Sequence, residues 1–558
     1  MRRRTVVGGA AGVLLLAAGA AARAAGPGDG TTARPHRRLR EDPFTLGVAS
    51  GDPDHTGVVL WTRLAPQPLA ADGRGGMPPW PVRVDWVLAR DPRLRQVVRR
   101  GAAQALPERA HAVHVLVDGL APDRWYFYRF TADGHASPVG RTRTAPPPGA
   151  AGGRLRLAVA SCAMYEHGYF TAYRHLAAGR PDVVLHLGDY LYEYGPGEYL
   201  LPGGNPRTHV GGPARTLADY RRRYAQYRTD PDLQAAHAAA PWCAVPDDHE
   251  VANNWAGDVP QHPDPGFVRR RDAALRAYAE NLPLRAAAAA AGPGADLRAY
   301  RRLRWGRLAT VHLLDTRRHR DDQACGDNFR DCPAAADPAR TMLGAAQERW
   351  LDDGLRASAA VWDLIGQQVF LARRDRDPGP PLVTNQDCWD GYPAARDRLV
   401  RGWAAAGVRN PVVLTGDVHA HWVADVRADA ADPDAPVVGT ELVCSSVSSG
   451  GDGHDLDPAA HPFMPHNPHL RFYNYQRGYL LATLTPASLT ADFQVVPWVR
   501  TPGAPAYSRA RFVVRDRRPG ARAAYVRPLD PAPPPTPPSG GPPPQAEGVR
   551  APVWRTRQ

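Results

Sequence analysis

The chain of 558 residues contains no lysine, and all 69 of its basic residues are arginine. Schiff-base catalysis and the common phosphate-binding loop of nucleotide hydrolases both depend on a lysine amine. The sequence therefore excludes these two chemistries. Its formal net charge of +13 comes from arginines spread along the whole chain. Because they form no basic stripe and accompany no nucleic-acid-binding motif, we expect no specific binding to nucleic acids.

Cysteine is scarce as well. The six cysteines are Cys162, Cys243, Cys325, Cys332, Cys388 and Cys444. Cys325 and Cys332 lie in a loop rich in glycine, aspartate and asparagine, and their spacing predicts a disulfide in an exported protein. If one of the six binds a metal, an odd number remains, and at least one thiol stays unpaired.

A long hydrophobic run is also missing. Residues 1–26 read "MRRRTVVGGAAGVLLLAAGAAARAAG", whose apolar stretch is too short and too rich in alanine and glycine for a membrane span. The basic start and the small residues near Ala24 indicate an export signal. The arginines before Thr5 resemble a twin-arginine signal, which predicts recognition by the twin-arginine export machinery. The alternative is an ordinary secretory signal or an uncleaved anchor. We expect an exported protein that is extracellular or associated with the cell wall.

Short alternating apolar runs predict strands between residues 40 and 146. Among them are "GVVLWTRL", "VRVDWVLA", "AVHVLVDGL" and "WYFYRF", which turn residues separate at intervals typical of a β-sandwich. The stretch "GLAPDRWYFYRFTADG" is similar to the tyrosine-corner region of fibronectin type III domains. We therefore predict a fibronectin- or immunoglobulin-like β-sandwich domain over 40–146, with a proline- and glycine-rich linker at 144–153.

From residue 154 onward, apolar strands alternate with helical stretches, which indicates an α/β domain over 154–515. The predicted strands are 155–161, 182–188, 242–246, 308–315, 362–369 and 411–417, and residues 478–497 resemble a late hairpin. The stretch "TLADYRRRYAQYR" predicts a helix that starts with a capping box of Thr216 and Asp219. The proline-rich segment 518–558 is predicted to be a disordered tail.

Several of these strands end in side chains that bind metals. The segments are "ASCAMYEHGYF" with Cys162, "GDYLYEY" with Asp189 and Tyr192, "PDDHEVANNW" with Asp247, Asp248, His249 and Asn254, and "TGDVHAHW" with Asp417, His419 and His421. The carboxyl ends of strands in an open α/β sheet meet in one crevice, so we expect these loops to converge. One such segment alone often does no more than cap a turn, but four in this order favour a metal site.

The order and the sequences of these segments resemble those of the PhoD-type alkaline phosphatase/phosphodiesterases of the metallophosphoesterase superfamily. The resemblance extends to "FTLGVASGDPDHTGVVLWTRL", "WDGYPAARDRL" and "NPHLRFYNYQRGYL", and it covers almost everything between Asp42 and Val514. It implies a four-layer α/β sandwich after the N-terminal β-sandwich. It also implies an exported hydrolase of phosphate mono- or diesters, in which two metal ions activate the attacking hydroxide.

The same resemblance implies ferric iron at one metal position, with Asp189 as the bridging ligand and Tyr192 as a bound tyrosinate. A tyrosine ligand must lose a proton whose unperturbed pKa is about 10, and a trivalent cation makes that loss easy. Cys162 occupies the place where broader relatives carry an Asp-x-His motif, and thiolate also suits iron. His419 matches the histidine on the iron side, whereas His421 is either a ligand or a partner of one.

The second metal position is expected to hold calcium. The bridging Asp189, together with Asp248 and Asp417, supplies oxygen ligands, which favour a hard cation. The resemblance implies that this cation is calcium. Asn254 or Asp247 would complete its larger coordination shell.

His249 matches the family's histidine beside a ligand carboxylate, which stabilises the transferred phosphoryl group or protonates the leaving alkoxide. Arg270 or Arg271, in "GFVRRRDAALRAY", is a candidate to bind a phosphate oxygen, although such pairs more often lie on a solvated helix face. Two alternatives to the exported phosphatase stay open. One is a phospholipase D-like phosphodiesterase acting on phospholipids, and the other is a catalytically inactive binding protein of the cell envelope. We expect a monomer.

Overall fold

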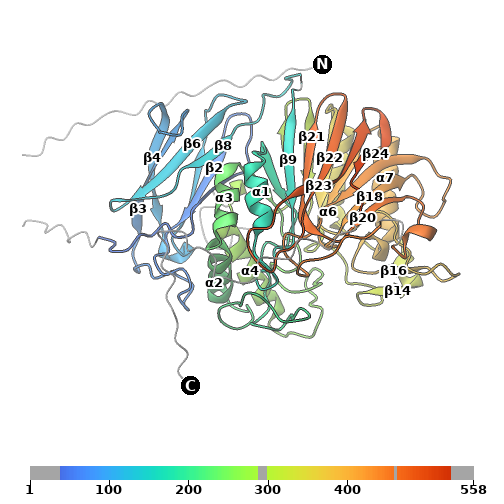
Figure 1. Ribbon diagram of the computed structural model, residues 1–558, viewed down its shortest axis with the longest axis horizontal. Coiled ribbons are helices and arrows are strands. Elements are labelled where there is room, and N and C mark those ends of the chain that lie inside the picture. Colours follow the sequence, from blue (N-terminus) through green and yellow to red (C-terminus); the bar gives the residue numbers. More distant parts are fainter. Residues whose placement is uncertain (1–37, 152, 287–297, 458–460, 530–558) are drawn as a thin grey trace, which may run out of the picture. The chain divides into compact units, whose positions relative to one another are not determined.

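The computed structural model describes residues 38–151, 153–286, 298–457 and 461–529, which form two large sheets with helices packed against them (Figure 1). The predicted export signal over 1–26 lies outside the described residues, as does the end of the predicted tail. Within the described part of the chain, no helix is long and apolar enough to cross a membrane.

The larger sheet has ten strands. Their order is β24 (Arg518–Val526), β23 (Tyr507–Arg515), β22 (Ser488–Val496), β21 (Arg477–Leu484), β9 (Leu155–Ala160), β10 (Val183–His186), β11 (Trp242–Ala244), β1 (Val48–Gly51), β2 (Val58–Arg63) and β5 (Ala112–Val117). The central strands β9, β10 and β11 run parallel, and β21 pairs with β22 as an antiparallel hairpin. The three strands and the hairpin predicted in this part of the sequence are therefore confirmed.

The second sheet has seven strands. Their order is β12 (Arg301–Trp305), β13 (Ala309–Leu313), β15 (Trp362–Gln367), β17 (Pro411–Thr415), β19 (Val437–Val443), β18 (His421–Arg427) and β20 (Leu470–Asn474). Strands β13, β15, β17 and β19 are parallel, which confirms the three strands predicted here. A separate antiparallel pair is formed by β14 (Phe329–Asp331) and β16 (Val383–Asn385).

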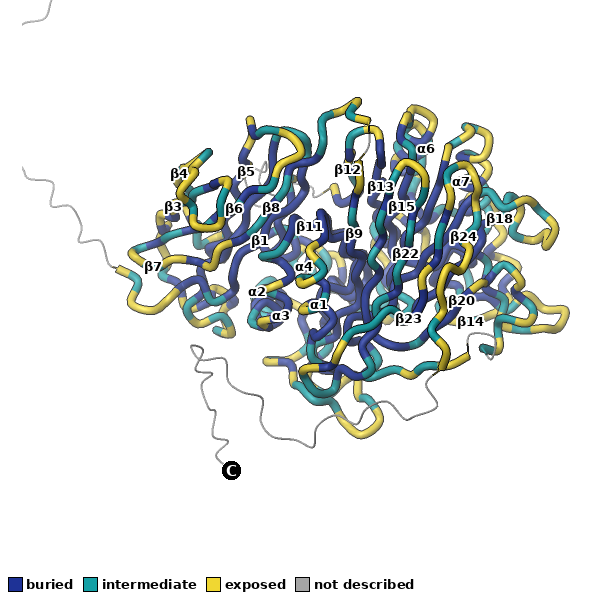
Figure 2. The backbone as a smooth tube through the Cα atoms, turned by 45° about the horizontal axis from the view of Figure 1, so that its top comes forward, coloured by how far each residue is buried: buried dark blue, intermediate teal, exposed yellow. Residues whose placement is uncertain are grey.

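Helices and apolar side chains fill the space on both sides of these sheets. The helices are α1 (Thr171–Ala178), α2 (Leu217–Arg228), α3 (Pro231–Ala239), α4 (Phe267–Asn281), α6 (Gly344–Arg356) and α7 (Pro393–Ala405). On β9, Val159 belongs to a core shared with the second sheet, whereas Ala158 and Ala160 contribute to a cluster with α1 to α4. This alternation follows the two-residue period of a strand. Figure 2 shows the buried backbone along β9, β13 and β15.

Helix α2 begins as its sequence predicts. The Thr216 Oγ accepts a hydrogen bond from the Asp219 N–H, and the Asp219 carboxylate accepts one from the Thr216 N–H. This reciprocal cap satisfies N–H groups that have no partner inside the helix. Tyr220, Tyr224 and Tyr227 are buried on the side of α2 that packs toward the first sheet.

The N-terminal strands divide between two sheets. A second group forms a smaller sheet in the order β4 (Val97–Ala105), β3 (Val82–Ala89), β6 (Trp125–Ala132) and β7 (His135–Ala136), and β8 (Gly140–Arg143) also pairs with β6. Strands β1, β2 and β5 instead continue the ten-stranded sheet, because β1 pairs with β11. Tyr126 Oη donates to the Ala121 carbonyl at 3.1 Å, which is the hydrogen bond of a tyrosine corner.

The structure corrects the start of the predicted tail. Residues Arg518–Val526 form β24, which is hydrogen-bonded to β23 at the edge of the ten-stranded sheet. The prediction of disorder from residue 518 was therefore wrong for this strand. An exposed strand edge carries unpaired N–H and C=O groups, and a neighbouring strand satisfies them. The proline-rich composition that suggested disorder begins only after β24.

Arg63 joins the N-terminal strands to the helices of the first sheet. Its buried guanidinium donates hydrogen bonds of 3.0 Å to the Ala110 carbonyl, the Arg221 carbonyl and the Asn281 Oδ1. These acceptors come from three separate segments of the chain, so one side chain holds them in register.

We expect Arg63→Ala to lower the free energy of unfolding by about 3 kcal/mol or more, because each buried acceptor left without a donor costs about 1–3 kcal/mol. Urea denaturation followed by circular dichroism measures the change. The exposed Arg522 is the matched control, and its alanine variant should change stability by less than about 0.5 kcal/mol. An unchanged midpoint for Arg63→Ala would contradict this role.

Candidate metal centre

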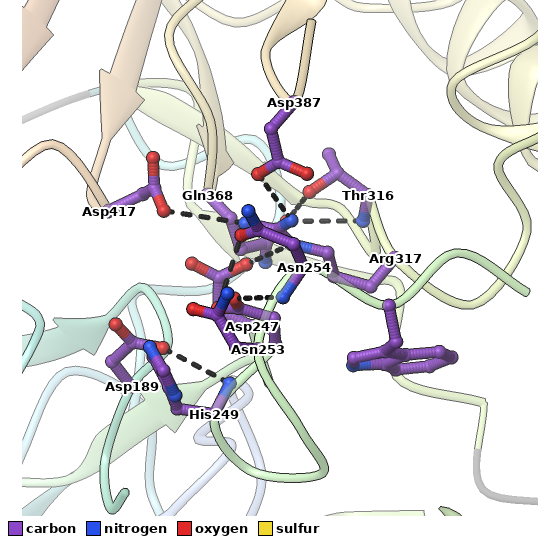
Figure 3. A network of polar contacts seen from close by, with 12 residues as sticks. Asp189, Asp247, His249, Asn253, Asn254, Thr316, Arg317, Gln368, Asp387 and Asp417 are labelled. Atoms are coloured by element: carbon purple, nitrogen blue, oxygen red, sulfur yellow. Dashed lines mark hydrogen bonds and ion pairs between the residues drawn. The ribbon is translucent and has the colours of Figure 1, made fainter. Parts of the chain in front are cut away.

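Loops that follow β9, β10, β11 and β17 bring most of the predicted ligands close together. Figure 3 shows three of them, Asp189, Asn254 and Asp417. Three groups of donors have ligand atoms within 4.8 Å of one another: Cys162, Asp189 and His419; Asp189, Asp248 and His249; and Asp247, Asp248 and Asp417. Asp189 belongs to the first two groups, and Asp248 belongs to the last two. The groups are therefore contiguous, and a single carboxylate lies between neighbouring positions.

The backbone at these donors has an unusual conformation. Cys162, Asp189, Asn254, Asp417 and His419 all have φ between 51° and 60°. Residues other than glycine seldom adopt this left-handed backbone conformation. Each one that does destabilises the folded state by on the order of 1–3 kcal/mol. The surrounding structure must hold these turns in place. Such strain clusters at functional sites, which supports a functional role for the crevice.

Glycines allow the strand ends to approach each other. Gly188 has φ of 103°, and a Cβ atom there would lie 2.3 Å from the Cβ of Asp247. A Cβ at Gly416 would lie 3.0 Å from the Cβ of Ser161. Any larger residue would therefore push apart the loops that carry the donors.

The first donor group and the adjacent Tyr192 contain buried side chains that keep their protons. The Tyr192 hydroxyl donates to Asp189 Oδ2 at 2.8 Å and lies 3.0 Å from His419 Nε2. Burial raises the pKa of Tyr192 well above its ordinary value, and the nearby charges of Asp189 and Cys162 raise it further. Burial and Asp189 likewise raise the pKa of the Cys162 thiol, while burial lowers the pKa of His419 to about 3. Only a strong positive charge would draw the protons off the Tyr192 hydroxyl and the Cys162 thiol, whereas His419 is already neutral.

Carboxylates around a buried arginine make up the last donor group. Arg317, 1 % exposed, contacts Asp247 through Nε and lies 2.6 Å from Asp387, 3.3 Å from Asp417 and 3.6 Å from Asp248. The contacts to Asp387 and Asp417 are drawn in Figure 3. Burial raises the pKa of Asp417 to about 6. Burial also opposes ionisation of Asp248, but the positive charges of Arg317 and His249 together with the hydrogen bond from the Asn254 N–H outweigh it and hold the pKa of Asp248 below its usual value.

Two oxygens in this group are buried without a hydrogen-bond partner among the described residues, namely Asp247 Oδ2 and Asp248 Oδ1. A buried carboxylate oxygen without a partner is costly, and a bound cation would satisfy it. Asp417 keeps 23 % of its side chain exposed, so the group is open to solvent on that side. The donor set therefore fits an oxygen-ligated cation.

His249, a member of the second donor group, is held by two polar contacts. Its Nδ1 lies 2.8 Å from Glu193 Oε2, and its backbone N–H donates to Asp189 Oδ1 at 3.4 Å. Burial alone would lower the pKa of His249, but the carboxylates of Asp248 and Glu193 outweigh it and raise the pKa well above 6.5. The site therefore presents a protonated imidazole beside Asp189 and Asp248.

Asn254 is oriented by hydrogen bonds on two sides. Its backbone N–H donates to Asp248 Oδ2 at 2.7 Å, and its Nδ2 donates to Asp327 Oδ2 at 2.7 Å. Asp327 lies in the loop closed by the disulfide between Cys325 and Cys332, which confirms the predicted pairing. The other four cysteines are free and buried, including Cys162.

The two arginine candidates contact groups other than the donors. Arg270 donates to the Tyr220 hydroxyl at 3.0 Å and the Ala214 carbonyl at 3.1 Å. Arg271 forms ion pairs with Asp258 and Asp272, whose side chains are exposed.

His421 is outside the three donor groups. Its Nδ1 accepts a hydrogen bond from the Ser445 N–H at 3.0 Å. A phosphate-binding role for Arg270 or Arg271 stays a prediction, and so does the choice between ligand and supporting residue for His421.

Sequence reasoning assigned no role to Glu193, the partner of His249, or to Ser449, whose hydroxyl donates to the Tyr192 oxygen at 2.8 Å. Glu193 is part of the segment "GDYLYEY", but no spacing in that segment distinguishes it as the partner of a histidine. Arg317 follows a predicted strand end, where Gln368 Oε1 accepts hydrogen bonds from the neighbouring Thr316. Its contact with four carboxylates was not visible in the sequence.

Adjacent donor groups that share one carboxylate, at the carboxyl ends of parallel strands, are typical of hydrolases that use two metal ions. Residues 157–493 match the family model of the PhoD-like phosphatase, and residues 30–146 match that of its N-terminal domain. The chain therefore belongs to the PhoD-like phosphatase family, as its sequence motifs had indicated. It is a phosphoric ester hydrolase.

Individual relatives agree with this assignment. The chain is 46% identical over 483 residues to alkaline phosphatase D of Bacillus subtilis (strain 168), across 86% of this chain and 82% of that protein. A solved structure of PhoD matches with a TM-score of 0.85 and 45% identity, across 88% of this chain and 94% of that one.

We expect Arg317→Met to lower the free energy of unfolding of the chelator-treated protein by about 3–5 kcal/mol, because it leaves buried carboxylates without their cation. Urea denaturation measures the loss. Arg349→Met, at an exposed position of α6, serves as the control and should have little effect. A variant as stable as the parent would show that the carboxylates are neutral without Arg317.

Proposed function

We propose that this protein is an exported alkaline phosphatase/phosphodiesterase that hydrolyses phosphate esters at a centre of ferric iron and calcium. One observation carries the proposal. Asp189 belongs to two adjacent donor groups, as a carboxylate that bridges two metals must. The presence of a competent side chain at each matched position argues against an inactive binding protein.

Iron would be held by Cys162, Tyr192, His419 and the bridging Asp189. The thiol and the phenol are buried and keep their protons without a cation, so a bound metal must supply a high charge. Thiolate and phenolate are both donors that suit ferric iron.

Calcium would be held by Asp189, Asp248 and Asp417, with the Asn254 amide oxygen completing the shell. Two observations support this assignment. The Asn254 amide nitrogen is engaged by Asp327, which leaves the amide oxygen as the available donor. Carboxylate and amide oxygens are also the ligands that calcium prefers.

When bound, the two metals supply an activated hydroxide and withdraw charge from the phosphoryl group. His249 holds a proton for the leaving alkoxide: Glu193 engages its Nδ1, so its Nε2 is the nitrogen that can donate. Arg270 is the better of the two arginine candidates for phosphate binding. The carboxylate of Glu193, which contacts His249, is close enough to Arg270 to help raise the pKa of its guanidinium. Arg271 is the weaker candidate.

The remaining parts of the proposal concern the whole chain. They are export by the twin-arginine machinery, a location outside the cell or in the cell wall, and a monomeric state. They also include a fibronectin-like sandwich over 40–146 and a four-layer α/β domain that starts at residue 154. The shared core between the two large sheets and the helix clusters on their other sides support the layered arrangement.

We expect the protein exported by its own signal to contain iron and calcium and to be coloured, because ferric tyrosinate absorbs visible light by charge transfer. Tyr192→Phe should abolish the band, and elemental analysis with the visible spectrum tests both points. Tyr190→Phe is the matched control, since its hydroxyl bonds to His237 instead. A colourless protein with zinc or manganese would contradict the iron assignment and leave Tyr192 a structural role.

We expect Glu193→Gln to shift the alkaline limb of the profile of kcat/KM against pH downward by about one unit, since one pKa unit corresponds to about 1.4 kcal/mol. The Glu193 carboxylate helps to raise the pKa of His249. The protonated imidazole is present below this pKa and is lost as pH rises through it, so a lower pKa brings the loss to lower pH. Glu198→Gln, in the following loop, is the control. If the alkaline limb of the Glu193→Gln profile did not shift, His249 would not be the acid that protonates the leaving alkoxide.

A further inference from the structure

Aromatic rings lead from the metal centre to the surface. The ring centroids of Tyr194 and His249 are 5.3 Å apart, and those of Tyr194 and Tyr199 are 5.7 Å apart. His167 packs edge-on against Tyr199 at 4.5 Å. Exposure rises along this path from 6 % at His249 to 38 % at Tyr199 and 63 % at the neighbouring Leu200. The path is thus buried at the reacting end and open at the other.

The loop that carries these rings is fixed by buried polar groups. Glu166, 1 % exposed, accepts a hydrogen bond of 2.9 Å from the His209 N–H and one of 3.2 Å from the Gly197 N–H. Arg223, also buried, donates to the Tyr194 carbonyl at 2.7 Å. A buried carboxylate and a buried guanidinium are costly to place, and here both serve to hold one surface loop.

Tyr199 itself is held at its backbone. Its carbonyl accepts hydrogen bonds from His167 Nε2 at 3.0 Å and from Asn205 Nδ2 at 2.9 Å. Its ring therefore keeps its place while remaining exposed to water. A partner that binds there does not have to order the loop, so little conformational entropy opposes binding.

The position of these rings indicates which part of a substrate they would contact, namely the leaving alcohol. The proposed acid His249 stands where the leaving alcohol departs, and Tyr194 is the next ring outward. A small polar alcohol would bury little apolar area against two tyrosine rings, whereas a planar ring would gain both stacking and buried apolar area.

We propose that Tyr194 and Tyr199 form a subsite for the leaving alcohol of the ester, and that this alcohol carries an aromatic ring. The inference rests on the proposed phosphoester hydrolysis with His249 as the acid, but not on which metals the centre holds. Tyr194 and Tyr199 bind the substrate in this account and take no part in proton transfer.

The test compares two diesters whose leaving alcohols have similar acidity, methyl 4-chlorophenyl phosphate and methyl hexafluoroisopropyl phosphate. Hydrolysis by the metal-loaded enzyme is followed by phosphorus NMR. We expect kcat/KM to favour the aryl ester by about tenfold, the effect of one or two aromatic contacts. Tyr199→Ala and Tyr194→Leu should each reduce this ratio several-fold, mainly through KM.

The ratio is measured within each variant, so a partial loss of folded protein cancels. Tyr525→Ala, at an exposed tyrosine of β24, is the matched control and should keep the ratio of the parent enzyme. A ratio near one in the parent, or a ratio unchanged in both subsite variants, would overturn the subsite while leaving the hydrolase intact. Hydrolysis of neither ester would instead count against the proposed function.

Discussion

Compensation of buried negative charge governs the structure around the crevice. Asp189, Asp247 and Asp248 are almost fully excluded from water and lie close enough for each to affect the ionisation of the others. Such a group is unstable unless positive charge is placed among it. Arg317 and the protonated His249 supply part of that charge, and the protons kept by neighbouring donors supply more. Asp247 Oδ2 and Asp248 Oδ1 accept no hydrogen bond among the described residues, although Arg317 lies 3.6 Å from the latter. The protein's own groups therefore leave the compensation incomplete, which is the condition for binding a cation.

This electrostatic demand explains the backbone at the site. Donors must point into one small volume from the ends of different strands, and five of them do so from left-handed turns. Gly188 removes the side chain that would keep the β10 and β11 ends apart. The cost of these conformations is met by the two large sheets, whose shared core holds the strand ends in fixed positions. The packing of the two sheets thus stabilises the strained turns that position the donors at the carboxyl ends of the strands.

Much of this arrangement could be predicted from local pattern. The strands of both large sheets, the capping box of α2 and the disulfide between Cys325 and Cys332 all depend on neighbouring residues, and each was found where the sequence indicated. The convergence of Cys162, Asp189 and Asp417 followed from their places after parallel strands. The start of the tail was misjudged because the composition of the whole segment, rich in proline after residue 527, concealed the nine-residue strand β24.

The sequence by itself determined which chemistry is available: no lysine, a cysteine and a tyrosine at strand ends, and carboxylates in the order of one phosphatase family. Only the tertiary structure decided how these groups act on one another. It joined β1, β2 and β5 to the sheet that carries Cys162 and Asp189 at its strand ends, and it placed Arg317 among four carboxylates that are distant from it in the chain. The physical reason is that ionisation and metal affinity depend on distances between side chains and on their exclusion from water, and both arise only when the two sheets pack together.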